Sequence, residues 1–201
     1  MADKTILRLN RRTIKLFEAT KNKLWTAKFD ELNVIREIKD LYAHLDKENK
    51  KEFISLFLKK YEEICGKKES DEYAEYHVSM ILEEPHPVTR YAYNAEVFRK
   101  RDRATEGINA VPAIEKNHEI EKAMRFWSQM TTWYVDFVSD EANIAALKKM
   151  GIQKVVWHKQ ADEYVCKTCQ DMDGNVYSIN NIPPKPHPSC RCYVTPYNII
   201  S

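Results

Sequence analysis

Glycine is scarce in this chain, which has 4 glycines among 201 residues. A fold built from many short strands needs turn residues, so this scarcity argues against an all-β architecture and favours helices. The sequence also lacks an apolar run of about 18 residues that could span a membrane, and residues 1–12 lack the apolar centre of a secretory signal. We therefore expect a protein that is made in the cytoplasm and has no membrane partner.

Common catalytic and nucleotide-binding motifs are missing as well. The sequence contains no Walker loop, no dinucleotide-binding glycine pattern, no metalloprotease His-Glu-x-x-His motif and no nucleophile elbow. The net charge of +2 is too small to require a nucleic-acid partner. We therefore expect a protein that is not an enzyme and that has no small-molecule substrate.

Apolar residues at helical spacing predict an α-helical body before residue 151. Residues 5–45 contain neither glycine nor proline. The apolar face expected to be buried in this part consists of Phe29, Leu32, Ile35, Ile38, Leu41, Tyr42 and Leu45. Asp46 is expected to cap a second helix that ends at Gly66, and Ser70 a third that ends before Pro85. The residues expected to face inward on the third helix are Tyr73, Tyr76, Met80 and Ile81.

The second half of the helical body carries most of the aromatic residues. A fourth helix is expected over residues 88–107, and Pro112 suits the first turn of a long fifth one. The aromatic stripe along this fifth helix is Ala123, Phe126, Trp127, Met130, Trp133, Tyr134 and Phe137. Ser139 and the two acidic residues after it predict the start of a short sixth helix, closed by Gly151. Such a stripe is usually core, and the alternative is a docking face for another subunit.

The pattern changes after Gly151. Residues 154–157 are typical of a strand, Asp173-Gly174 of a hairpin turn, and the proline-rich residues 182–188 exclude a helix or an inner strand. We expect a mainly α fold with an elongated helical body and a small C-terminal α+β or β module resembling a zinc knuckle. The expected regions are 1–86, helical; 87–151, helical with the aromatic-striped helix; and 152–201, the Cys/His-rich module.

The most informative cluster lies in this module. The chain has five cysteines, and four of them stand between residues 166 and 192. Thiolates and imidazole are the ligands that zinc prefers, in a tetrahedral set of four. The candidate ligands number five: Cys166, Cys169, His187, Cys190 and Cys192. The favoured set is the first four, with Cys192 either replacing His187 or packing nearby.

A structural metal fits the size of the module. A segment this small cannot bury much of a core, so bound zinc would supply folding energy, and a closed site of four ligands is structural rather than catalytic. The alternatives are disulfides or free thiols, although cytoplasmic cysteines at this spacing more often bind metal.

Asp162, Glu163 and His158 are acid/base candidates, but no partner geometry is visible and we interpret them as solvated residues near a strand end.

Two basic stretches are candidate surfaces for DNA or an acidic partner. Residues 3–28 hold eight basic and two acidic residues, a net charge of +6, and the second stretch is Arg99-Lys100-Arg101-Asp102-Arg103. The alternative for both is a solvated helix face. The candidate contact residues are Lys4, Arg8, Arg11, Arg12, Lys15, Arg99, Lys100, Arg101 and Arg103.

The module resembles a known family. The residues that carry the resemblance are Trp157, Asp162, Cys166, Cys169, Asp173, Gly174, Pro183, Pro184, His187, Cys190 and Cys192. They are similar to the signature of the phage minor head, or head morphogenesis, family of phage Mu F-like proteins, and His-Pro-x-Cys-Arg-Cys is its most specific element. The strong similarity covers about residues 150–196, and residues 123–151 are similar to the helical lead-in of the family.

The resemblance implies a virion protein. Family members are low-copy procapsid components that associate with the portal vertex, and some bind DNA and affect packaging or genome delivery. It implies the portal protein, the major capsid protein or both as partners, with packaged double-stranded DNA as a further candidate, and a location in the capsid interior or at the portal vertex. It supplies no catalytic residue. Two alternatives stay open: a nuclease-like or modifying phage enzyme that uses the Cys/His window, and a zinc-dependent nucleic-acid binder.

Overall fold

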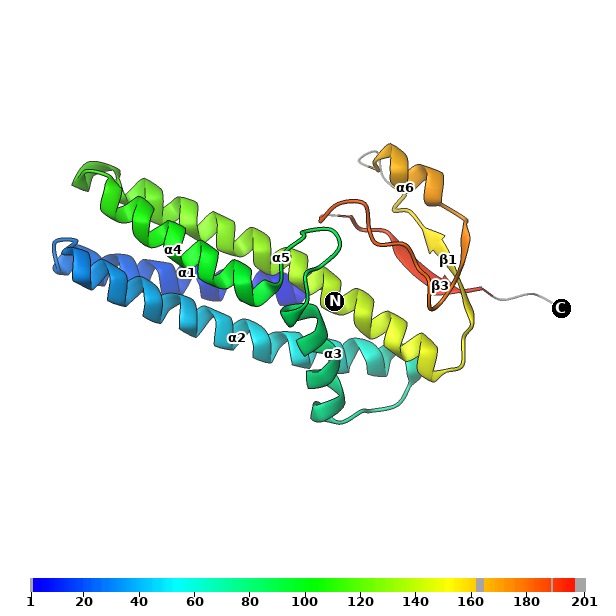
Figure 1. Ribbon diagram of the computed structural model, residues 1–201. Helices are drawn as coiled ribbons and strands as arrows, with labels where there is room; N and C mark the ends of the chain where they lie inside the picture. Colours follow the sequence, from blue (N-terminus) through cyan, green and yellow to red (C-terminus); the bar gives the residue numbers. More distant parts are fainter. Residues whose placement is uncertain (1, 162–164, 189, 198–201) are drawn as a thin grey trace.

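Four long helices form the body of the protein in the computed structural model, which describes residues 2–161, 165–188 and 190–197. They are α1 (Ala2–Thr26), α2 (Glu31–Cys65), α4 (Tyr93–Ala110) and α5 (Lys116–Lys149), with a short 3₁₀ turn η1 (Ala113–Glu115) before α5. The helices run along one another in an elongated bundle, and the short helix α3 (Asp71–Glu83) packs near one end (Figure 1). The mainly helical fold predicted from the sequence is confirmed.

One apolar core runs through the bundle. Trp127 and Tyr134 of α5 are buried, and their rings meet those of Tyr42 and Tyr93 edge to face, with centroids 5.2 and 4.8 Å apart. Burying a large apolar side chain stabilises a fold by about 1.5–3 kcal/mol, so this aromatic stripe supplies much of the bundle's cohesion. Residues 1–86 and residues 87–151 both contribute to this core.

The expected helix boundaries at Asp46 and Ser139 are wrong, because α2 and α5 run through them. The Asp46 carboxylate pairs with Lys50 Nζ one turn ahead at 2.9 Å. The Ser139 hydroxyl donates to the Val135 carbonyl one turn behind at 2.8 Å. Both side chains therefore find partners inside a continuous helix, where a short polar residue need not act as a cap.

Several apolar residues expected to face inward are exposed. The exposed fraction of the side chain is 76% for Leu32, 64% for Tyr76 and 43% for Met80. The buried face of α3 consists of Ala74, Val78 and Leu82, which are offset from the face that the larger side chains suggested. Tyr73 and Ile81 pack against the core as expected, whereas Tyr76 and Met80 form an outward surface of α3.

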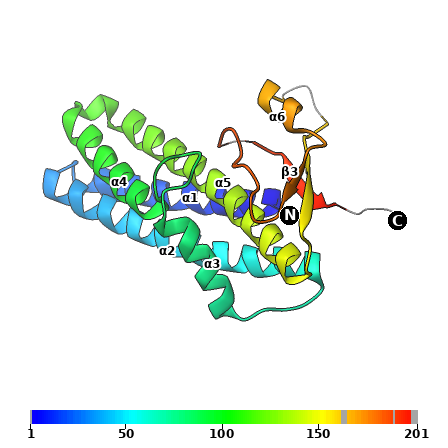
Figure 2. The same ribbon diagram turned by 45° about the vertical axis from the view of Figure 1, so that its right-hand side comes forward.

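The C-terminal module is built on a three-stranded antiparallel sheet. The central strand β1 (Lys154–His158) pairs with β2 (Val176–Ser178) on one side and β3 (Tyr193–Pro196) on the other, and α6 (Lys167–Met172) lies between β1 and β2 in sequence. The module lies alongside the C-terminal half of α5 in both views (Figures 1 and 2). Its own core consists of Leu147, Val155, Trp157, Cys169, Ile179, Cys190, Cys192 and Val194. Among the described residues, no helix has the length and apolarity needed to cross a bilayer.

Candidate metal centre

Three short segments bring the candidate ligands together. Cys166 is the N-cap of α6, and its sulfur accepts a hydrogen bond from the Cys169 backbone N–H at 3.4 Å. His187 lies near the end of the proline-rich segment, and its carbonyl accepts from the Cys190 N–H at 3.1 Å. Cys190 and Cys192 lead into β3. The short helix, the turn and the strand thus fix the backbone beside each ligand.

The ligand atoms form two overlapping groups of three. Within each group, Cys166, Cys169 and His187 or Cys169, Cys190 and Cys192, these atoms all lie within 4.8 Å of one another. Cys169 belongs to both groups, and its sulfur is 3.4 Å from that of Cys190. All five residues line a small cavity of about 260 Å³. The fold therefore gathers the five residues predicted from the sequence into two groups of three that share Cys169.

The electrostatics of the cluster suit a cation. Cys169, Cys190 and Cys192 are buried, and the five cysteines of the chain are free thiols. Burial raises the pKa of the Cys169 thiol, with contributions from the neighbouring cysteines, and burial also raises the pKa of Cys190. The Cys169 N–H lowers the pKa of Cys166. A divalent cation would stabilise these sulfurs as thiolates, the form that binds zinc, so the donor set fits a zinc ion.

The other residues of the family-like motif lie around this cluster. Trp157 is buried on β1, and its carbonyl accepts from the Gly174 N–H at 2.9 Å, where Gly174 takes the left-handed conformation with φ +77°. The Asp173 carboxylate accepts from the Lys159 N–H at 2.9 Å. Asp173 and Gly174 thus form a turn that leads from α6 into β2, rather than the expected hairpin turn. Asp162 lies outside the described residues.

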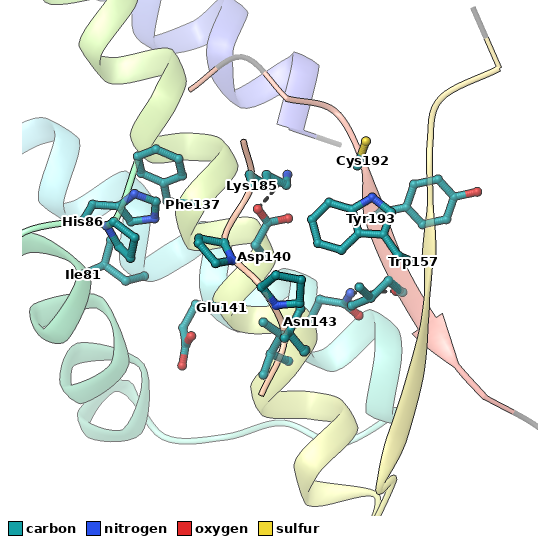
Figure 3. Close-up of a pocket in the computed structure, with 16 residues that line it drawn as sticks. Ile81, His86, Phe137, Asp140, Glu141, Asn143, Trp157, Lys185, Cys192 and Tyr193 are labelled. Carbon is teal, nitrogen blue, oxygen red and sulfur yellow. Dashed lines mark hydrogen bonds and ion pairs between the residues drawn. The ribbon is translucent and has the colours of Figure 1, made fainter. Parts of the chain in front are cut away.

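A cleft of about 310 Å³ separates the module from the bundle (Figure 3). Pro184 and Trp157 line its module side, and Phe137 lines its α5 side. Across it, Lys185 Nζ lies 2.7 Å from the Asp140 carboxylate. The sequence offered no periodic or motif signal for this pair, since Asp140 was interpreted as the first turn of a separate helix. The pair joins the proline-rich segment to α5.

The N-terminal basic stretch is neutralised in part by α2. Arg8 forms an ion pair with Glu52, and Arg12 Nη1 lies 2.8 Å from Glu48. These pairs join α1 to α2 within the bundle. Lys4, Arg11 and Lys15 have no ion-pair partner among the described residues. Of the five N-terminal candidates, those three are therefore the ones available to an external anion.

The second basic stretch is largely paired as well. Arg99 and Lys100 both contact the Glu96 carboxylate, at 2.6 and 3.8 Å, and Arg101 contacts Asp102 at 2.7 Å. Arg103 is exposed and has no ion-pair partner in the described part of the chain. This stretch is therefore less free to bind phosphates than its sequence suggests.

His158, the acid/base candidate, is held within the sheet. Its Nε2 lies 2.7 Å from the Thr195 hydroxyl, and its ring stacks on Tyr193 with centroids 5.2 Å apart. The structure therefore gives this histidine cross-strand contacts to β3.

Comparison with known families identifies the second half of the chain. Residues 105–195 match the family described as phage Mu protein F like protein. The matched region begins in α4 and includes α5, the sheet and the whole Cys/His cluster. No curated protein and no solved structure matches the chain. The family recognised from the cysteine motif is thereby confirmed.

Proposed function

We propose that this chain serves as a minor head protein at the portal vertex, a role supported by the match of residues 105–195 to the phage Mu protein F like family. Its role there is structural, in procapsid assembly, DNA packaging or genome delivery. The family is a structural one, which agrees with a role that rests on contacts with other head components rather than on catalysis.

The observation that carries this proposal is the gathering of five metal-ligating side chains in a module fastened to a long helical body. Two overlapping ligand groups share Cys169, and the cluster is continuous with the small core of the sheet. A zinc ion bound by four of these residues would hold the module in one rigid conformation, because structural zinc sites contribute folding energy directly. Zinc is the metal that this donor set favours.

The helical body supplies the surface for partners. The family implies contacts with other phage capsid components, and the partners that we propose among them are the portal protein, the major capsid protein or both. Lys4, Arg11 and Lys15 lack ion-pair partners in the described residues, so they are the basic residues of α1 that can contact packaged DNA or an acidic protein surface. We assign DNA contact to these three rather than to Arg8 and Arg12, whose charges are used inside the bundle.

Procapsid composition tests this function. The phage that encodes the chain would be made with and without its portal protein, and the chain would be quantified in purified procapsids by mass spectrometry. We expect a low copy number in procapsids that contain the portal, and loss of the chain from those without it. Absence from all procapsids, or equal amounts in both preparations, would contradict a role at the portal vertex.

A further inference from the structure

We propose that copies of this chain associate head to tail, with the exposed face of α3 from one copy lying in the groove between α4 and α5 of the next. The groove has a small basic excess and the α3 face is acidic. The two surfaces have similar length and exposed apolar residues, and they lie at different places on the bundle. This inference is independent of the metal site and of the proposed place in the virion.

The first surface is a groove along the bundle with a volume of about 490 Å³. Small residues keep its floor low, since Ala104, Gly107 and Ala110 of α4 face Ala123 of α5. The lining residues of α4 run from Lys100 to Ala110, which is about 15 Å of helix at 1.5 Å per residue. The groove is therefore long enough for about three turns of an incoming helix.

A buried hydroxyl at the base of this groove has no partner. Tyr42 lines the groove but belongs to α2, which packs behind α4 and α5. The side chain is 1% exposed, and no described residue hydrogen-bonds its hydroxyl. The hydroxyl is enclosed by its neighbours, so Tyr42 is part of the floor of the groove rather than a contact for an occupant.

The rim of the groove carries three basic and two acidic residues and an exposed ring. Lys100, Arg103 and Lys122 line it together with Glu106 and Glu119. Lys122 already contacts Glu119 at 3.2 Å, whereas Arg103 has no ion-pair partner among the described residues. Phe126 is 46% exposed, and Lys100 Nζ lies 5.4 Å from the centre of its ring. An occupant needs acidic groups beside an apolar strip.

The outward face of α3 has these properties. Residues 71–84 contain five acidic residues and no lysine or arginine, and none of the five has an ion-pair partner in the described part of the chain. Tyr76 and Met80 stand one turn apart at the centre of this face and are 64% and 43% exposed. Glu72 and Glu83 flank them on the same side of the helix. The stripe from Glu72 to Glu83 is about 16 Å long, which matches the groove.

The positions of the two surfaces require a second copy. Both views place α3 near the end of the bundle where the module lies, whereas the α4–α5 groove extends toward the opposite end (Figures 1 and 2). One chain therefore cannot place its own α3 in its own groove. An interface between two different patches is heterologous, and repetition of it closes a ring or extends a filament.

Charge reversal on the two sides tests this contact. The groove variant carries Arg103→Glu and Lys122→Glu, and the α3 variant carries Glu72→Lys and Glu83→Lys. Sedimentation velocity at low salt would show the wild-type mass rising with protein concentration, and each variant weakening association by about tenfold or more. Lys39→Glu and Asp40→Lys are the matched controls, because both residues are exposed on α2 and have no ion-pair partner among the described residues. The controls should associate like the wild type.

Mixing experiments separate a heterologous contact from other modes of association. The groove variant mixed with the α3 variant should recover association, because the unchanged α3 face of the first fits the unchanged groove of the second and the two reversed surfaces are complementary to each other. A chain with both reversals should associate again, because the charges are complementary once more. Tyr76→Ser with Met80→Ser should also weaken association without a change of charge.

Three outcomes would overturn the proposal. The first is a wild-type protein that stays monomeric at every concentration and salt level tested. The second is association that neither reversal reduces more than the controls do. The third is duplex DNA binding that the groove variant loses while self-association is unchanged, which would make the groove a DNA surface.

Discussion

Lys185 and Asp140 form an ion pair at 2.7 Å that joins the proline-rich segment of the module to the C-terminal half of α5. Lys185 stands two residues before His187, so one segment carries both the contact to the bundle and a candidate metal ligand. Burial raises the pKa of Asp140, and Lys185 opposes this rise. The contact of the module with the bundle and the candidate metal site therefore share a single short segment.

Removing the lysine of this pair should loosen the module. Lys185→Met leaves the Asp140 carboxylate without its partner in a partly enclosed cleft. We expect a loss of about 1–2 kcal/mol in the free energy of unfolding, between the values for exposed and buried pairs. Urea unfolding measures it, with Lys149→Met as the control because Lys149 belongs to a more exposed pair with Glu69. Equal losses in the two variants would contradict an anchoring role for Lys185.

Stability should fall in mild acid because of His86. Its ring stacks on Phe137 with centroids 3.6 Å apart, and burial, with Lys185 nearby, lowers its pKa to about 4. As the pH falls, His86 of the unfolded chain therefore takes up a proton at a higher pH than His86 of the folded chain does. The stabilising effect of the neutral ring is complete above about pH 6.5 and is lost as the pH falls toward 4. Since the ring is half-buried, we expect a loss of about 1 kcal/mol, well below the value for full burial.

The variant His86→Asn isolates this effect. Asparagine does not titrate, and its side-chain oxygen can accept the hydrogen bond that the Val88 N–H gives to His86 Nδ1. Urea unfolding of both proteins at neutral and at mildly acidic pH should give a smaller pH dependence for the variant. The same pH dependence in both would assign the acid sensitivity to other groups.

Cysteine substitutions should differ in their effect on metal binding. Cys169 belongs to both ligand groups, whereas Cys166 and Cys192 each belong to one. Cys169→Ser should therefore weaken zinc binding more than Cys166→Ser or Cys192→Ser does. In each of the latter two variants, one group of three ligands stays complete. Competition with a chromogenic chelator measures the affinities. Zinc affinity that is unchanged in Cys169→Ser would exclude this cysteine as a ligand.

The basic residues of α1 should separate into two groups. Replacing Lys4, Arg11 and Lys15 by glutamine should weaken duplex DNA binding, and the slope of log affinity against log salt concentration should become shallower by about 0.9 for each phosphate that the variant no longer binds. The stability of the fold should change little, because these side chains have no ion-pair partner in the described residues. Arg12→Gln should instead lower stability, since its pair with Glu48 joins two helices. Wild-type DNA affinity in the triple variant would remove α1 from the DNA-binding surface.

Much of the fold could be predicted from short-range chemistry. The side chain of Ser70 accepts from the Tyr73 N–H as an N-cap, and Gly66 ends α2 in the left-handed conformation, as their positions indicated. The strand at residues 154–157 and the turn at Gly174 also follow from local sequence. The Cys/His spacing placed all five candidate ligands in one small region, which the structure brings together.

Features that depend on distant partners could not be predicted. Asp46 and Ser139 resemble caps, and only the surrounding core and their contacts one turn away show that the helices continue through them. The strand at residues 193–196 pairs with β1, which lies far earlier in the chain, and the Lys185–Asp140 pair joins equally separated segments. Tyr76 was expected to be buried because it stands at helical spacing from other apolar residues of α3. Its burial depends instead on which face of α3 packs against α2.

The metal content of the protein tests the central claim most directly. Native mass spectrometry of protein purified under reducing conditions, before and after a strong chelator, would be combined with circular dichroism of the tryptophan and tyrosine bands. We expect a single zinc ion per chain, and its removal should unfold the C-terminal module while the helical bundle stays folded. A metal-free protein with free thiols and a folded module would contradict the claim that a bound metal ion stabilises the C-terminal module.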